Sequence, residues 1–178
     1  MVKNIFAVKL MKSKDKNEYS KDFRTGDLNF EEIVGTECQI LELYRLFKQR
    51  SKVTKISANS ELEYNKHVEF VENHPYRYWF LIRHNEIYIG TVYLTDLNSM
   101  GLSVEDKYIY CTEKIITLMA NRFDPLPAKP SVRRASFHMN IGRENQEFEK
   151  ILINIGAEIM QKSYVLPIDV VSKSKLKN

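Results

Sequence analysis

The apolar residues of this chain recur with helical spacing in some segments and with strand spacing in others. Residues 137–158, FHMNIGRENQEFEKILINIGAE, show both, because an alternating segment leads through a polar turn into a helix. The apolar residues of that helix stand at i, i+3, i+4 and i+7, namely Phe148, Ile151, Leu152 and Ile155. Gly156 follows as a C-cap and ends the helix.

The same reading along the chain predicts elements in the order β, α, α, β, β, β, α, β, α, β, β. The predicted strands cover residues 28–33, 78–82, 86–95, 99–104, 133–140, 159–161 and 164–166. The predicted helices run from Thr36 to about Arg50, from Ser60 to shortly before Pro75, from about Lys107 to Asn121, and from the turn at Asn145 to Ile155. Ser60 and Glu63 form the pattern of a capping box at the start of the second helix. Three prolines predict an irregular loop over residues 123–131.

This order of elements predicts an α/β (α+β) fold. An antiparallel meander over residues 78–104, followed by a crossover, gives a mixed, mostly antiparallel sheet flanked by helices. Such a sheet can splay open where antiparallel pairing gives way to parallel pairing, and a ligand can enter there. We expect one domain over residues 27–168, preceded by an appendage of residues 1–26 and followed by a tail of residues 169–178.

Composition narrows the possible functions. The chain has 178 residues, 43% of them hydrophobic, which suits one domain with a full core. Its 27 Lys and Arg against 23 Asp and Glu are spread out, so a nucleic-acid groove is not predicted, whereas a small anionic ligand suits the net charge of +4. Cys38 and Cys111 show no metal-ligand spacing, so we expect no metal and a reducing, cytoplasmic location. No apolar run approaches 18 residues, so no membrane partner is expected.

Two segments carry a resemblance to a known family. The block NIGREN at Asn140 to Asn145, with its helix and the Gly156 stop, resembles the last motif of the GNAT superfamily of N-acetyltransferases. The segment YWFLIRHNEIYIGTVYLT is similar to that family's strand, hairpin and Ile-Gly-x-Val strand. The resemblance covers about residues 27–166 and implies a GNAT-like acyl-CoA N-acyltransferase fold. It also implies acetyl transfer from acetyl-CoA, as co-substrate, to a primary amine of a small acceptor.

A weaker similarity concerns the acceptor. Residues 60–70 followed by Trp79 resemble nucleotide-amino-sugar N-acetyltransferases, which implies a nucleotide-linked amino sugar as the acceptor. One departure keeps alternatives open, because residues 105–114 hold no glycine where the family has a glycine-rich phosphate turn. A catalytically altered binding or assembly module, or an enzyme with a different acyl or formyl donor, would also fit. A homodimer is a further expectation.

The resemblance assigns the candidate donor site to the strand 99–104, the start of the next helix and the NIGREN block. The candidate cofactor-binding residues are Leu102, Val104, Lys107, Tyr108, Cys111, Asn140 and Asn145. Two of these have a structural alternative, since Asn145 can equally cap the last helix and Cys111 fits a helix core better than a reactive thiol.

The candidate catalytic residues are Glu105, Tyr164 and Tyr93. Glu105 ends the strand beside the expected thioester and is the candidate proton acceptor, provided that partial burial raises its pKa; it can equally cap the next helix. The family's usual tyrosine position holds Leu152, so Tyr164 and Tyr93 are the candidate acids, with sheet packing as the alternative.

The candidate acceptor-binding residues are His67, Trp79 and Arg133. His67 lies on an apolar helix stripe, where a hydrogen-bonded core histidine is the more frequent case. Arg133 and Arg134 are adjacent on a predicted strand, which would place one guanidinium on each face of the sheet.

Overall fold

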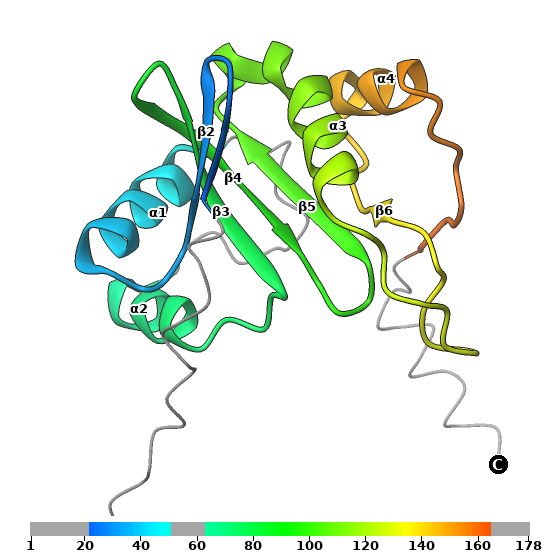
Figure 1. The fold of residues 1–178 in the computed structure, drawn as a ribbon, viewed down its shortest axis with the longest axis horizontal. Coiled ribbons are helices and arrows are strands. Elements are labelled where there is room, and N and C mark those ends of the chain that lie inside the picture. The colour runs from blue at the N-terminus through cyan, green and yellow to red at the C-terminus, as the bar shows by residue number, and fades with distance from the viewer. Residues whose placement is uncertain (1–21, 51–62, 165–178) are drawn as a thin grey trace, which may run out of the picture.

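The computed structural model describes residues 22–50 and 63–164, which form a mixed sheet of six strands with helices on both faces (Figure 1). The strands are β1 (Phe23–Thr25), β2 (Leu28–Glu32), β3 (Tyr78–His84), β4 (Ile87–Leu94), β5 (Ser99–Val104) and β6 (His138–Met139). The helices are α1 (Glu37–Gln49), α2 (Tyr64–Glu72), α3 (Thr112–Arg122) and α4 (Gln146–Asn154), and a 3₁₀ helix (Asp106–Cys111) leads into α3. Neighbouring strands follow chain order from β1 to β6, and only the β5–β6 pair is parallel. The predicted mixed, mostly antiparallel sheet flanked by helices is confirmed.

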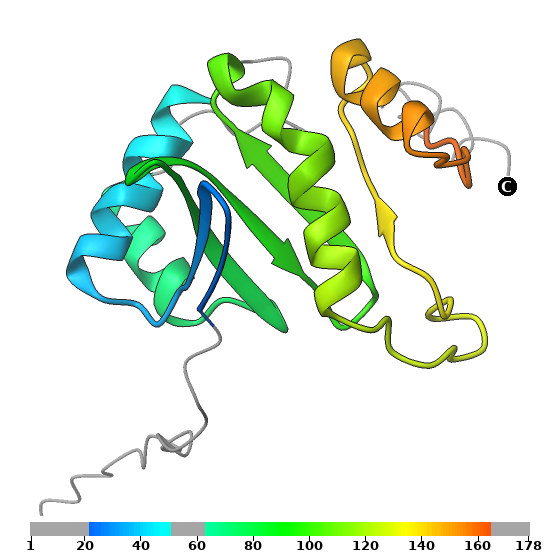
Figure 2. The same cartoon turned by 45° about the horizontal axis from the view of Figure 1, so that its top comes forward.

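Two apolar clusters hold the helices to the sheet. On one face α1 and α2 cover a cluster that includes Ile40, Val71 and Leu81. On the other face α3 and α4 cover a larger cluster that includes Ile115 and Phe148. Figure 2 shows the sheet between these two helical layers. The alternation of side chains along each strand explains why both faces are apolar.

The start of α1 is fixed by local hydrogen bonds. Thr36 and Gln39 form a capping box, in which the hydroxyl of Thr36 accepts from the backbone N–H of Gln39. The Gln39 side chain is buried, and hydrogen bonds satisfy its polar atoms there. Its oxygen accepts from Val34 N–H at 2.9 Å, and its amide donates to Glu31 at 2.8 Å. The predicted helix from Thr36 to about Arg50 is therefore confirmed.

The second helix begins later than predicted. α2 starts at Tyr64, and Glu63 before it has extended backbone angles and makes no side-chain cap. Because Glu63 is extended, it is not the third residue of a helix that begins after Ser60, so the predicted helix start is wrong. The predicted cap contacts of Ser60 lie outside the described residues. The helix expected from Lys107 is also different at its start, because residues Asp106–Cys111 wind as a 3₁₀ helix before α3 begins.

The predicted strand 133–140 is wrong in extent, because only His138–Met139 pair with the sheet. Arg133 lies instead in the irregular loop, where it bridges with Lys129. That loop, predicted from its prolines, is pinned by the buried Asn98, whose side chain donates to the carbonyls of Leu126 and Arg134 and accepts from Leu126 N–H, each at 2.8 Å.

The ends of the predicted domain also differ. β1 lies inside the predicted appendage, where Phe23 stacks on Phe30 with ring centroids 4.2 Å apart. No strand forms over residues 159–161, and Tyr164 lies in irregular backbone. Residues 1–21 and 165–178, which include the predicted tail and most of the last strand, are outside the described part of the chain.

Candidate functional site

A cleft opens where β5 and β6 part. The two strands pair only at Ser99 with His138 and at Met100 with Met139, so residues 101–104 have no partner strand on that side within the described chain. The resulting cavity has a volume of about 390 Å³. Its walls come from the end of α1, the loop before β3, β4, β5, the 3₁₀ helix, β6, the turn before α4 and α4 itself. The lining residues are Phe47, Arg50, Tyr76, Tyr93, Ser99–Val104, Ile109, Met139–Gly142, Asn145 and Phe148.

Strand β5 presents different side chains to its two faces. Met100 and Val104 pack into the apolar cluster under α3. Gly101 and Ser103 face α1 and α2, since the ring of Tyr93 lies against Gly101 and Ser103 contacts Arg50. The free backbone edge of the strand therefore separates an apolar side from a polar, aromatic side.

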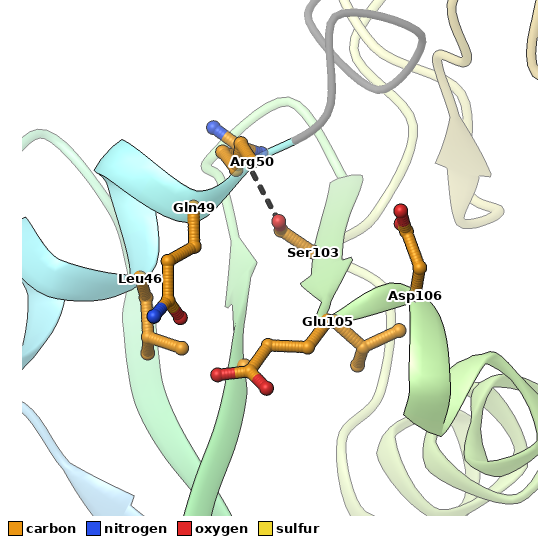
Figure 3. Close-up of a pocket in the computed structure, with 8 residues that line it drawn as sticks. Leu46, Gln49, Arg50, Ser103, Glu105 and Asp106 are labelled. Atoms are coloured by element: carbon orange, nitrogen blue, oxygen red, sulfur yellow. Dashed lines mark hydrogen bonds between the residues drawn. The ribbon is translucent and has the colours of Figure 1, made fainter.

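The polar side of the cleft contains an arginine and two tyrosines. Arg50 follows the last turn of α1, and its Nε donates to Ser103 Oγ at 2.8 Å, as Figure 3 shows. The rings of Tyr76 and Tyr93 stack with centroids 4.0 Å apart and 12° between their planes. Burial and the neighbouring Tyr93 hydroxyl raise the pKa of Tyr76 to about 12, so its hydroxyl keeps its proton at neutral pH.

Glu105 is not on the walls of this cleft. Its side chain extends toward α1 and lines a smaller neighbouring pocket with Arg50 and Ser103 (Figure 3). Its carboxylate accepts from Arg45 at 2.8 Å and lies 3.1 Å from Nζ of Lys107. Burial alone would raise the pKa of Glu105, but the hydrogen bonds from Arg45 and Lys107 outweigh it and hold the pKa below its ordinary value. The expectation that burial raises this pKa is wrong. Glu105 makes no side-chain cap for the 3₁₀ helix either.

The start of α3 is closed rather than open to an anion. Thr112, its first residue, is fully buried, and its N–H bonds to the carbonyl of Ile109 in the 3₁₀ helix. Tyr108 packs against the core, and Cys111 is buried there with its pKa raised by burial. Lys107 is exposed but already paired with Glu105. The N–H of Thr112 is therefore not free for an anion, and the helix start that was expected near Lys107 is the first turn of the 3₁₀ helix instead.

Asn145 has the predicted cap geometry and also borders the cleft. Its side-chain oxygen accepts from Phe148 N–H at 3.3 Å, which starts α4. Gly156, at φ 84°, ends the same helix, as predicted for a C-cap. Among the predicted site residues, the structure thus gathers Tyr93, Leu102, Val104, Asn140 and Asn145 around the cleft.

The remaining predicted site residues lie elsewhere. His67 is a buried core residue whose Nε2 contacts the Ile40 carbonyl at 3.1 Å, and burial lowers its pKa, so the alternative of a hydrogen-bonded core histidine is confirmed. Trp79 is buried under α2, and its indole donates to Thr91 at 2.6 Å. Neither side chain is open to an acceptor.

Arg133 and Tyr164 are also away from the cleft walls. Arg133 donates to the carbonyls of Pro127 at 2.9 Å and Asp96 at 2.6 Å, so it braces the loop. Tyr164 is 83% exposed beyond α4. Over residues 22–50 and 63–164 no group of His, Cys, Asp and Glu is arranged to hold a metal ion. None of the helices in these ranges is long and apolar enough to cross a bilayer.

Sequence reasoning missed Arg50, Tyr76 and Ser103 as cleft residues. Arg50 and Tyr76 lie on either side of α2, and Ser103 lies on β5, so no local spacing links them. The only sequence signal is the placement of Arg50 directly after the apolar stripe of α1, which is common for a surface arginine. No family model matches this chain, and no curated protein matches it either.

Proposed function

We propose that this chain is a GNAT-like acyltransferase that moves an acetyl group from acetyl-CoA to a primary amine of a small acceptor. The proposal rests on the edge of β5 at residues 101–104, which has no partner strand on the β6 side among the described residues and borders a cleft of about 390 Å³. A pantetheine arm is extended and carries two amides, so it can hydrogen-bond to such an edge as an added strand would. The resemblance of the NIGREN block and the meander supports the same assignment.

The reaction needs few groups from the protein. The acceptor nitrogen attacks the thioester carbonyl, a C–N bond forms, the C–S bond breaks, and one proton passes in net from the amine to the leaving thiolate. Backbone N–H groups of β5 would polarise the carbonyl oxygen. No carboxylate or imidazole is among the described cleft-lining residues, so water is the proton acceptor, and the Tyr93 hydroxyl is the candidate acid.

One observation favours a second candidate donor. The residues before α3 contain no glycine and form a 3₁₀ helix with Glu105 and Asp106 at its start. Two carboxylates at this point disfavour a bound diphosphate, whereas the uncharged pantetheine arm does not need a phosphate site. A thioester donor whose diphosphate is not held by the protein, or a formyl or other acyl donor, is the alternative. A binding module that keeps only the fold has no specific observation in its favour.

The test measures thermal unfolding with three compounds. Acetyl-CoA at about 100 times its dissociation constant should stabilise the chain by about 2.7 kcal/mol, which corresponds to roughly 5–10 °C in Tm for a domain of this size. Acetylated phosphopantetheine, which lacks the nucleotide, should give a comparable shift if only the arm is held. Adenosine 3′,5′-diphosphate is the control for the nucleotide alone.

Each outcome decides between the candidates. A shift with both thioesters and none with the nucleotide supports pantetheine binding without a diphosphate site. A shift that requires the whole acetyl-CoA places a phosphate site on the protein despite the closed helix start. No shift with either thioester, together with no thiol release from acetyl-CoA in the presence of a panel of amines, would reject the acyltransferase proposal.

A further inference from the structure

Arg50 is a half-buried cation on the wall of the cleft. It stands at the C-cap of α1, and its side chain reaches β5, where Nε donates to Ser103 Oγ at 2.8 Å. Ser103 is a neutral partner, and no acidic side chain among the described residues forms an ion pair with Arg50, although Glu105 and Asp106 line a neighbouring pocket with it. Burial lowers the pKa of Arg50, which reports the cost of desolvating that charge, but a guanidinium stays protonated in proteins.

The other partly buried arginines on the same face show the usual arrangement. Arg45, on α1, donates to Glu42 at 2.7 Å and to Glu105 at 2.8 Å. Arg83, on β3, lies 3.3 Å from Glu31. For Arg50, in contrast, no carboxylate within the described residues forms an ion pair. A partly desolvated charge gains most from an opposite charge, and here a ligand can supply it.

Hydroxyl groups complete this corner of the cleft. Tyr76 and Tyr93 line the same cleft as Arg50, and their rings are fixed by stacking on each other. Tyr76 keeps its proton because its pKa is raised to about 12, so it presents a neutral hydroxyl beside the cation. Arg50, Ser103, Tyr76 and Tyr93 all line the same cleft, and guanidinium and hydroxyl donors on one wall of a cavity can bind a carboxylate or phosphate oxygen.

We infer that Arg50, Ser103, Tyr76 and Tyr93 form a binding site for an oxyanion, a carboxylate or a phosphate, carried by the acceptor. That the bound anion belongs to the acceptor rests on the proposed acyltransferase function. The anion site itself does not depend on that function. These residues lie on the α1 and α2 side of β5, while the free backbone edge proposed for the donor faces β6. The acceptor is then an amine that also carries a negative charge.

The first experiment measures anion binding without any acyl transfer. Inorganic phosphate and acetate are titrated into the full chain by calorimetry at constant ionic strength, with chloride as the background. Arg50→Gln should weaken binding of at least one anion tenfold or more. Lys48→Gln removes the same charge from the exposed last turn of the same helix and should bind as the wild type does.

A second variant tests the same site in case Arg50→Gln does not fold. Tyr93→Phe keeps the stacked ring and removes one hydroxyl, so it should weaken the same anion several-fold while its Tm stays close to that of the wild type. Absence of binding by either anion to the wild type, or equal binding by Arg50→Gln, Lys48→Gln and the wild type, would overturn the site.

The last experiment assigns the anion to the acceptor and identifies its chemistry. Thiol release from acetyl-CoA is compared for glucosamine and glucosamine 6-phosphate, and for ethylamine and β-alanine. The charged member of one pair should have a KM at least tenfold lower, and Arg50→Gln should remove that preference while the Tm shift with acetyl-CoA stays the same.

If Arg50→Gln instead abolishes the acetyl-CoA shift, the anion belongs to the donor and the acceptor assignment is wrong. If phosphate or acetate binds through Arg50 and no amine is acetylated, the anion site holds and the proposed function fails.

Discussion

The ring of Tyr93 lies directly on the backbone of Gly101, so that any side chain at position 101 would collide with its hydroxyl end. Residues 93 and 101 are paired across β4 and β5, and a glycine on one strand lets an aromatic ring on the next lie flat over it. The same ring stacks on Tyr76 and forms part of the cleft wall. The shape of the polar side of the cleft therefore depends on a missing Cβ.

We expect Gly101→Ala to lower the free energy of unfolding by about 1–3 kcal/mol, because the Tyr93 ring must move and lose its stack. The near-ultraviolet circular dichroism of the tyrosines should change with it. Gly90→Ala is the comparison, because its Cβ would meet the backbone, including the Cα of Val104 at 2.8 Å, which cannot rotate away. Chemical denaturation should rank Gly90→Ala as the more destabilised variant, and the reverse order would contradict the packing of Tyr93 on Gly101.

Asn145→Ala should cost about 1 kcal/mol of stability, because the first turn of α4 loses the oxygen that accepts from Phe148 N–H. Asn145→Asp keeps a capping oxygen at the same place and should be within a few tenths of a kcal/mol of the wild type. Urea denaturation of both variants measures the difference. Equal stability of the two would show that the cap does not stabilise α4, and that Asn145 serves the cleft alone.

Glu105→Gln should lower the free energy of unfolding by about 1 kcal/mol, because the carboxylate forms ion pairs with Arg45 and Lys107. Turnover should be unchanged, because Glu105 does not line the cleft. Glu63→Gln is a suitable control, since its ion pair with Lys66 is exposed on both sides and should contribute nothing measurable. Denaturation and thiol-release kinetics are measured on both variants. A turnover that falls tenfold or more with stability preserved would instead make Glu105 the proton acceptor.

The stability of the chain should depend on Asp27 in acid. The hydrogen bond from Lys114, with smaller help from His84, lowers the pKa of Asp27 from 3.8 to about 2. A carboxyl whose pKa is lower in the folded state stabilises the fold above pH 3.8, and this contribution disappears as the pH falls toward about 2. Between these values the Tm of the wild type should fall more steeply than that of Asp27→Asn. Parallel curves of Tm against pH for the wild type and Asp27→Asn would show that the ion pair of Asp27 does not contribute. Asp96→Asn, at an exposed position, is the control and should follow the wild type.

Local sequence determined the elements whose formation depends on near neighbours. Helix α4 was predicted because its apolar stripe, its Asn145 cap and its Gly156 stop all lie within twelve residues of each other. The meander was predicted because short turns join its strands. The turn between β3 and β4 falls at Asn85 and Glu86, both at positive φ, so β4 begins one residue later than predicted. Five predicted site residues also reach the cleft because they stand on or next to such elements.

Tertiary structure decided the features that join distant segments. β6 is short because a strand exists only where a partner lies beside it, and β5 diverges after Met100. Glu105 is an ion-pair partner rather than a free base because Arg45, sixty residues earlier, reaches it across the sheet. The polar side of the cleft joins Arg50 to Ser103, fifty-three residues apart. Among the described residues, the fold brings a neutral hydroxyl and no paired carboxylate to the Arg50 guanidinium. The spacing of residues along the sequence predicts helices, strands and their caps, whereas burial and the pairing of charges depend on which segments the fold brings together.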